Sequence, residues 1–178
     1  MKKVLLTLIT IFVINGVASA QAESYGAFKV DVMLGYANPA SSSGTVNGGL
    51  TFSIEPKYNL TDNIAVGLQL GSTILTSSNS AIGIAALGNY SLTGEYYFTD
   101  NKVRPFAGVG AGLYKFGDIE ITSGGQTQTI PGGGSVFGFA PRAGVQIGHF
   151  RIAAEYNLVK DSNFLALKIG ATIGGGSR

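Results

Sequence analysis

The chain has 178 residues, of which 12% are charged, 45% are apolar, 27 are glycine and none is cysteine. Without cysteine it can form neither a disulfide framework nor a cysteine-ligated metal site, and its 12 Lys and Arg against 10 Asp and Glu provide no cationic surface for nucleic acid. Because a soluble domain usually carries about a quarter charged residues, this composition favours apolar residues dispersed over many strands.

The first 20 residues have the pattern of a secretory signal peptide. Lys2 and Lys3 precede a compact apolar run at 4–14, and Ala18-Ser19-Ala20 supplies the small residues of a cleavage site. The run is too short for a transmembrane anchor, which needs roughly 20 apolar residues. We therefore expect residues 1–20 to be a cleaved signal peptide and residues 21–178 to form one domain, whose fold the following patterns indicate.

After residue 20 apolar and polar residues alternate with the two-residue period of a β-strand. At the start, for example, Phe28, Val30 and Val32 alternate with Lys29 and Asp31. The same alternation predicts eight strands, at 26–36, 50–59, 64–71, 87–98, 104–114, 137–148, 151–159 and 164–174. Strands of about ten residues can cross a bilayer when tilted. No segment after residue 20 has a helical period, so the expected fold class is all-β.

The connections between the predicted strands alternate in length. Short turns occupy 60–63, 99–102 and 148–150, and the first two share the sequence Thr-Asp-Asn, in which Asp and Asn favour tight turns. The other connections are longer, and the longest, at 117–135, is rich in Gly, Thr and Gln. Short turns on one rim and long loops on the other are typical of an outer-membrane barrel.

The alternation fits two kinds of barrel, which differ in the face that meets water. A soluble barrel of the lipocalin type buries its apolar face and solvates its charges, whereas a membrane barrel does the reverse. Here the polar faces carry few charges, and the apolar faces carry aromatic residues near strand ends, as membrane interfaces do: Tyr36, Tyr58, Tyr90, Tyr96, Phe98 and Tyr156. We therefore expect an eight-stranded antiparallel up-and-down transmembrane β-barrel with its polar face inside.

Three glycines, Gly108, Gly110 and Gly112, occupy alternate positions of the strand at 104–114. Glycine weakens a strand, so their repetition on one face needs a reason. In a narrow eight-stranded lumen they would leave room for large side chains from neighbouring strands. Relief of strand curvature is a second explanation, compatible with the first.

The polar faces also carry charged residues of both signs, which are expected to form a charge network in the lumen. A midplane Arg or Lys facing lipid would cost about 2–4 kcal/mol, whereas inside the barrel opposite charges can pair. Because Arg104 and Arg151 lie close to short turns, the periplasmic interface is the alternative location for these two side chains. The ten predicted lumen residues are Lys29, Asp31, Glu55, Lys57, Glu95, Arg104, Arg142, Arg151, Glu155 and Lys168.

The whole mature chain resembles the small outer-membrane β-barrel family that includes OmpX, OmpW, the OmpA membrane domain and the opacity proteins. The most specific motif is "RPFAGVGAGLY" at 104–114, which is similar to the family's Pro-aromatic strand with alternating glycines; "FAPRAGVQIG" at 139–148 supports it. The resemblance implies residence in the cell outer membrane, contact with outer-membrane lipid, and assembly by periplasmic chaperones and the barrel-assembly machinery.

These patterns predict a structural role, a role in surface interaction, or the limited passage of small solutes, without catalysis. No catalytic, cofactor-binding or metal-binding residues are predicted, no nucleic-acid partner is expected, and the loop at 117–135 is the candidate site for a surface ligand. Two alternatives remain open. One is a lipid-modifying outer-membrane enzyme, although the single histidine, His149, lies in a predicted turn; the other is a soluble lipocalin-like barrel that binds an apolar ligand.

Overall fold

The computed structural model describes residues 25–40, 46–77, 85–117, 119–123, 126–130, 132, 134–160 and 162–175. The predicted signal peptide at 1–20 lies outside the described residues, so its cleavage stays a prediction. Within the described part of the chain, no helix is long and apolar enough to cross a membrane.

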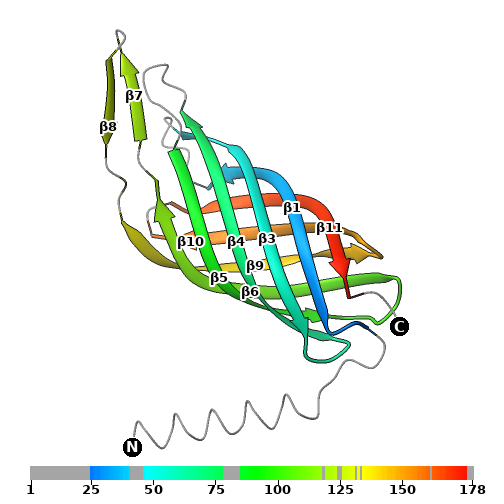
Figure 1. Cartoon of the computed structure of the whole chain (residues 1–178). Helices are drawn as coiled ribbons and strands as arrows, with labels where there is room; N and C mark the ends of the chain where they lie inside the picture. The colour runs from blue at the N-terminus through cyan, green and yellow to red at the C-terminus, as the bar shows by residue number, and fades with distance from the viewer. Residues whose placement is uncertain are drawn as a thin grey trace, which may run out of the picture.

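Eight long strands form a closed antiparallel barrel (Figure 1). Each pairs with its neighbours in chain order, and the first pairs with the last, with Val32 opposite Ala171, which closes the ring. The predicted eight-stranded antiparallel barrel is therefore confirmed. The strands are β1 (Phe28–Pro39), β3 (Gly49–Asn59), β4 (Ile64–Ser77), β5 (Ala85–Tyr97), β6 (Val103–Phe116), β9 (Ser135–Ile147), β10 (Phe150–Val159) and β11 (Phe164–Gly174).

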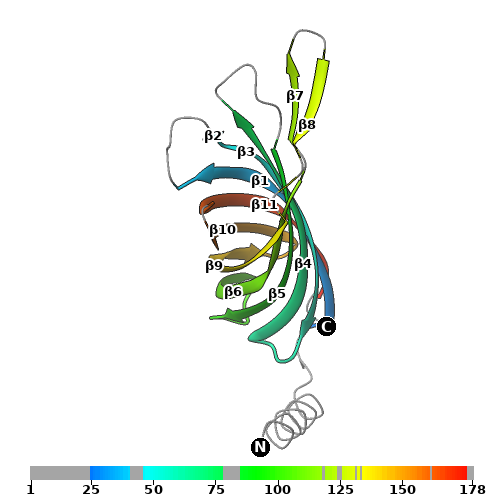
Figure 2. The ribbon, with the colours of Figure 1, turned by 90° about the vertical axis from the view of Figure 1, so that its left-hand side faces the viewer.

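The structure differs from the predicted elements at the long-loop end. Strand β4 continues to Ser77 instead of ending at residue 71, and the short strand β2 (Val46–Asn47) pairs with this extension. The connection predicted as a loop at 117–135 contains a hairpin of β7 (Ile119–Ser123) and β8 (Gln126–Ile130), which projects beyond the barrel (Figures 1 and 2). These two strands pair only with each other, so their ladder is independent of the barrel's hydrogen bonds.

The outer face of the barrel is apolar and the inner face is polar. Leu92 is 71% exposed and Leu167 58% exposed, whereas Lys29 and Asp31 are completely buried. The six aromatic residues predicted for the membrane interface also lie exposed on the outside. This is the predicted membrane arrangement and the reverse of a soluble lipocalin-like barrel, whose outer face must be solvated.

Apolar side chains close the lumen toward the long-loop end. We call this group the loop-end cluster; it consists of Ala37, Leu87, Tyr114, Val159, Phe164 and Ala166. A second cluster includes Tyr97 and Phe106, near the short-turn ends of β5 and β6. The polar interior is therefore covered by packed apolar groups toward the loops.

The two Thr-Asp-Asn segments form turns at the opposite end, as predicted, but their threonines act differently. The Thr61 hydroxyl accepts hydrogen bonds from the backbone N–H groups of Asn63 and Ile64, at 3.2 and 2.9 Å. The Thr99 hydroxyl instead donates to the Val103 carbonyl at 2.8 Å. The shared sequence therefore predicts the turn, whereas the hydrogen bonds depend on the strands that follow.

Candidate functional site: the barrel lumen

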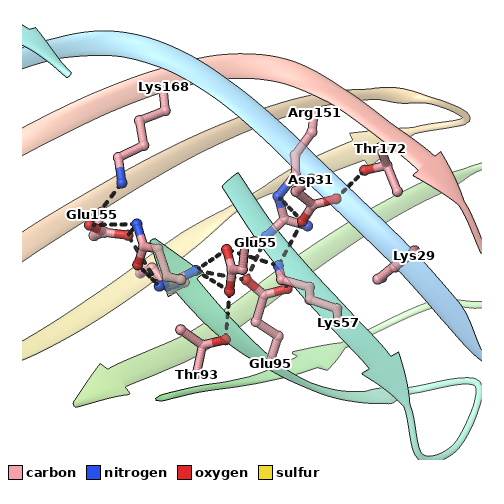
Figure 3. A network of polar contacts seen from close by, with 12 residues as sticks. Lys29, Asp31, Glu55, Lys57, Thr93, Glu95, Arg151, Glu155, Lys168 and Thr172 are labelled. Carbon is pink, nitrogen blue, oxygen red and sulfur yellow. Dashed lines mark hydrogen bonds and ion pairs between the residues drawn. The ribbon is translucent and has the colours of Figure 1, made fainter. Parts of the chain in front are cut away.

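Glu95 lies at the centre of a network of buried charges (Figure 3). One of its carboxylate oxygens is 2.6 Å from Arg151 Nη2 and the other is 2.7 Å from Lys57 Nζ. Arg142 Nη1 lies 3.3 Å away, and the Tyr97 hydroxyl donates to the same carboxylate at 3.0 Å. Three cations thus share one carboxylate. Further anions nearby are needed to balance their charge.

Asp31 supplies one of these anions on the side of β1. Its carboxylate is 2.7 Å from Lys57 Nζ and 3.3 Å from Arg151 Nε, and it accepts a hydrogen bond of 2.6 Å from the Thr172 hydroxyl. Asp31, Lys57, Arg151 and Glu95 therefore form a closed ring of alternating charge.

Arg142 carries the network toward the other side of the lumen. Its guanidinium is 2.9 Å from Glu55 and 3.3 Å from Glu155, and Glu155 in turn lies 2.9 Å from Lys168. Gln69 accepts a hydrogen bond of 2.5 Å from Arg142. The chain of contacts thus runs from β1 to β11 through the middle of the barrel.

The network contains as many acids as bases. Its four acids are Asp31, Glu55, Glu95 and Glu155, and its four bases are Lys57, Arg142, Arg151 and Lys168. All eight are at most 6% exposed, so the desolvation of each charge has to be offset by partners inside the barrel. Loss of any one charge leaves the remaining buried charges unbalanced.

Direct cross-strand pairing would not produce this network. In the β1–β3 register Lys29 stands opposite Lys57, and Asp31 stands opposite Glu55, and like charges directly opposite are unfavourable. The favourable contacts are instead diagonal, as between Asp31 and Lys57, or run across the lumen, as between Glu55 and Arg142. The closed barrel brings these partners together.

Two of the ten predicted residues lie outside this set of ion pairs. Lys29 donates to the Tyr97 hydroxyl at 2.9 Å. Arg104 donates to the backbone carbonyls of Thr99, at 3.3 Å, and Asp62. Arg104 thus lies at the short turns, the alternative location for both arginines. Arg151 lies in the network.

Several residues that complete the network were not among the predicted site residues. Gln69, Thr172 and Tyr97 all lie on the polar faces of their strands, and Thr93 donates to Glu55 at 2.5 Å. Each of these residues alternates with apolar residues along its strand, and this pattern predicts that its side chain faces the lumen. The pattern does not predict which side chains of the other strands it contacts.

Gly108 stands in register between two charged residues of the network. Its partner on β5 is Glu95 and its partner on β9 is Arg142. A Cβ at Gly108 would meet the Gly94 carbonyl oxygen and would lie 2.9 Å from Glu95 Cγ. Glycine here leaves the space across which Glu95 and Arg142 approach to 3.3 Å.

The other two glycines of the strand have different surroundings. A Cβ at Gly110 would lie 3.3 Å from Arg142 Nη2, whereas a Cβ at Gly112 would meet the Tyr90 carbonyl oxygen and lie 2.5 Å from Ser91 Cα. Gly110 therefore borders a large lumen side chain, and Gly112 allows close approach of the β5 backbone. Room for side chains and strand geometry each account for part of the pattern.

Little free space remains beside the centre of the network. The cavity beside Glu55, Arg142 and Glu155 has a volume of about 10 Å³, roughly the minimum for one water molecule. The loop-end cluster lies beyond it. At the level of the network the lumen is therefore filled by packed side chains.

His149 lies in the short turn after β9, as predicted. Its Nδ1 is 2.9 Å from the Thr172 carbonyl oxygen, which can only accept, so Nδ1 is the donor. Across the described residues, no group of three or more His, Cys, Asp or Glu could hold a metal ion.

The chain is similar to known outer-membrane barrels. Over residues 6–174 it matches the family described as the outer membrane protein beta-barrel domain. Neisserial surface protein A has a TM-score of 0.59 and 17% identity, with 85% of this chain and 99% of that chain covered. OprG from Pseudomonas aeruginosa has a TM-score of 0.58 and 14% identity, with 86% and 98% covered. None of the curated proteins compared with the chain matches it.

Proposed function

Since the chain belongs to the outer membrane protein beta-barrel family, we propose that it acts in the cell outer membrane as a closed, non-conducting barrel that presents its loops at the cell surface. The observation that carries this proposal is the packed interior: four acids and four bases fill the lumen around a cavity of about 10 Å³. A hydrated ion or small solute has no open path through such a core.

The β7–β8 hairpin is the element proposed to contact a surface ligand. It extends beyond the barrel at the end opposite the short turns (Figure 2), and loops on rigid scaffolds commonly carry binding functions. The ion-paired core beneath would hold the ends of β6 and β9 in place, so the hairpin starts from a rigid base.

Catalysis is not part of the proposal. The Nδ1 atom of the single histidine donates to a backbone carbonyl. Among the described residues, no hydrogen bond joins its ring to a hydroxyl or carboxylate side chain, as a nucleophile–base pair would need. Assembly by periplasmic chaperones and the barrel-assembly machinery, after removal of residues 1–20, belongs to the same proposal.

The closed lumen predicts that the folded protein has no unitary conductance in planar lipid bilayers. The barrel fold of each preparation is verified by a gel band that shifts on boiling. A mock purification from cells that lack the gene serves as the control for contaminating porins. Stable unitary currents that appear with the folded preparation and are absent from the mock preparation would contradict the closed barrel.

The proposed orientation predicts opposite accessibility at the two ends of the barrel. Since the chain has no native cysteine, the variants Ser123→Cys in β7 and His149→Cys in a short turn each carry a single thiol. A membrane-impermeant maleimide should label Ser123→Cys on intact cells, and His149→Cys only after permeabilisation. The reverse result would place the hairpin in the periplasm and exclude its surface role.

A further inference from the structure

A pocket lined by several polar and charged residues lies at the short-turn end of the barrel, apart from the central charge network. Its volume is about 470 Å³, and its lining includes Tyr25, Asp100, Lys102, Arg104 and Gln146. In barrels of this architecture the short turns face the periplasm. The pocket is thus on the side opposite the β7–β8 hairpin, and Gly174 at the end of β11 also lines it.

Arg104 is held rigidly in the wall of this pocket. Its Nε and Nη2 donate to the carbonyl oxygens of Thr99 and Asp62, one from each Thr-Asp-Asn turn. Its guanidinium carbon lies 3.9 Å from the ring centre of Tyr25 and 4.2 Å from that of Tyr97. These contacts fix the orientation of the guanidinium group, as binding sites for planar anions require.

One donor of Arg104 remains without a partner. The side chain is 2% exposed, and Nη1 has no hydrogen-bond partner within the described part of the chain. An unpaired buried donor on a charged group is costly. A carboxylate in the pocket would provide the missing acceptor.

Gln146, which also lines the pocket, carries an unpaired acceptor. Its Nε2 donates to the Gly148 carbonyl at 3.0 Å, which fixes the orientation of the amide, and its buried Oε1 has no partner among the described residues. Arg104 and Gln146 stand directly opposite each other in the β6–β9 register, where Cβ atoms are about 4.5–5.5 Å apart. The pocket wall therefore includes one buried donor and one buried acceptor on residues that are cross-strand partners.

We propose that this pocket binds an α-carboxylate together with the N–H group on the same α-carbon. Arg104 Nη1 would receive the carboxylate, and Gln146 Oε1 would receive the N–H group. The exposed rim residues Lys102 and Asp100 have opposite charges, which favours a ligand with both a donor and an anionic acceptor over a simple anion such as phosphate. The C-terminal residue of a peptide and a free amino acid both have this chemistry.

The test measures binding to the folded chain in detergent micelles by calorimetry and by NMR of the arginine side chains. The probes are N-acetyl-glycyl-glycine, its C-terminal amide, glycine and acetate. The acid peptide or glycine should bind saturably and shift the Arg104 signals, and the peptide amide should bind at least about tenfold more weakly, because it lacks the charged acceptor. Tighter binding of the peptide identifies a peptide C-terminus as the ligand, and tighter binding of glycine identifies a free amino acid.

Two variants separate the roles of the wall residues. Gln146→Leu should weaken peptide binding by about tenfold or more while acetate binding is unchanged, and Lys160→Gln, at an exposed turn, should change neither. Absence of binding of both acid probes to the unmodified chain would overturn the proposal. So would acetate binding as tightly as the peptide, since that would indicate a plain anion site.

Discussion

Glu95→Gln is expected to lower the free energy of unfolding by about 3–5 kcal/mol, the cost of breaking a buried ion pair by removing one partner. The substitution keeps the shape of the side chain and removes its charge. Lys57, Arg142 and Arg151, which lie 2.7, 3.3 and 2.6 Å from the carboxylate, would then share one anion fewer. The measurement is urea unfolding in lipid vesicles, followed by the heat-modifiable gel band.

The control for this prediction is Lys160→Gln, which removes a charge from an exposed turn and should change stability by less than about 0.5 kcal/mol. The double variant Glu95→Gln, Arg151→Gln should cost less than the sum of the two single variants, because it removes both members of one pair. If Glu95→Gln were no more destabilising than the control, the network would not contribute to the stability of the barrel.

Leu92→Arg is expected to cost about 2–4 kcal/mol, the penalty for a cation on the lipid face near the bilayer midplane. Leu92 is the most exposed of the large apolar residues on the outer face, at 71%. It stands between Leu68 on β4 and Ala111 on β6, in the middle of the barrel wall. The measurement compares the free energy of unfolding of the Leu92→Arg variant in lipid vesicles with that of the unmodified chain.

Ile64→Arg provides the depth control. Ile64 is the first residue of β4, at the short-turn end, where the penalty for a cation falls to about 0–1 kcal/mol. A barrel surrounded by water would tolerate arginine at both positions within about 0.5 kcal/mol. Equal effects at positions 64 and 92 would therefore contradict the membrane orientation.

The alternation of apolar and polar residues was sufficient to predict the eight barrel strands, apart from their ends at the long loops, and the face on which each side chain lies. Because side chains of a β-strand alternate between its two faces, the positions of Leu92 and Glu95 relative to the wall follow from the pattern alone. The pattern was less informative at the loops, where the five-residue strands β7 and β8 are too short for a clear period.

Which charges meet, in contrast, depends on how the strands are arranged in the closed barrel. The β1–β3 register places Asp31 opposite Glu55, yet Asp31 pairs with Lys57 and Arg151, and Glu55 pairs with Arg142 from β9. These partners depend on the curvature and closure of the barrel, which bring distant strands within the length of a side chain. The two-residue period of a strand predicts the face on which a side chain lies. A contact across the lumen depends on every strand between the two residues, so it cannot be predicted from the local sequence.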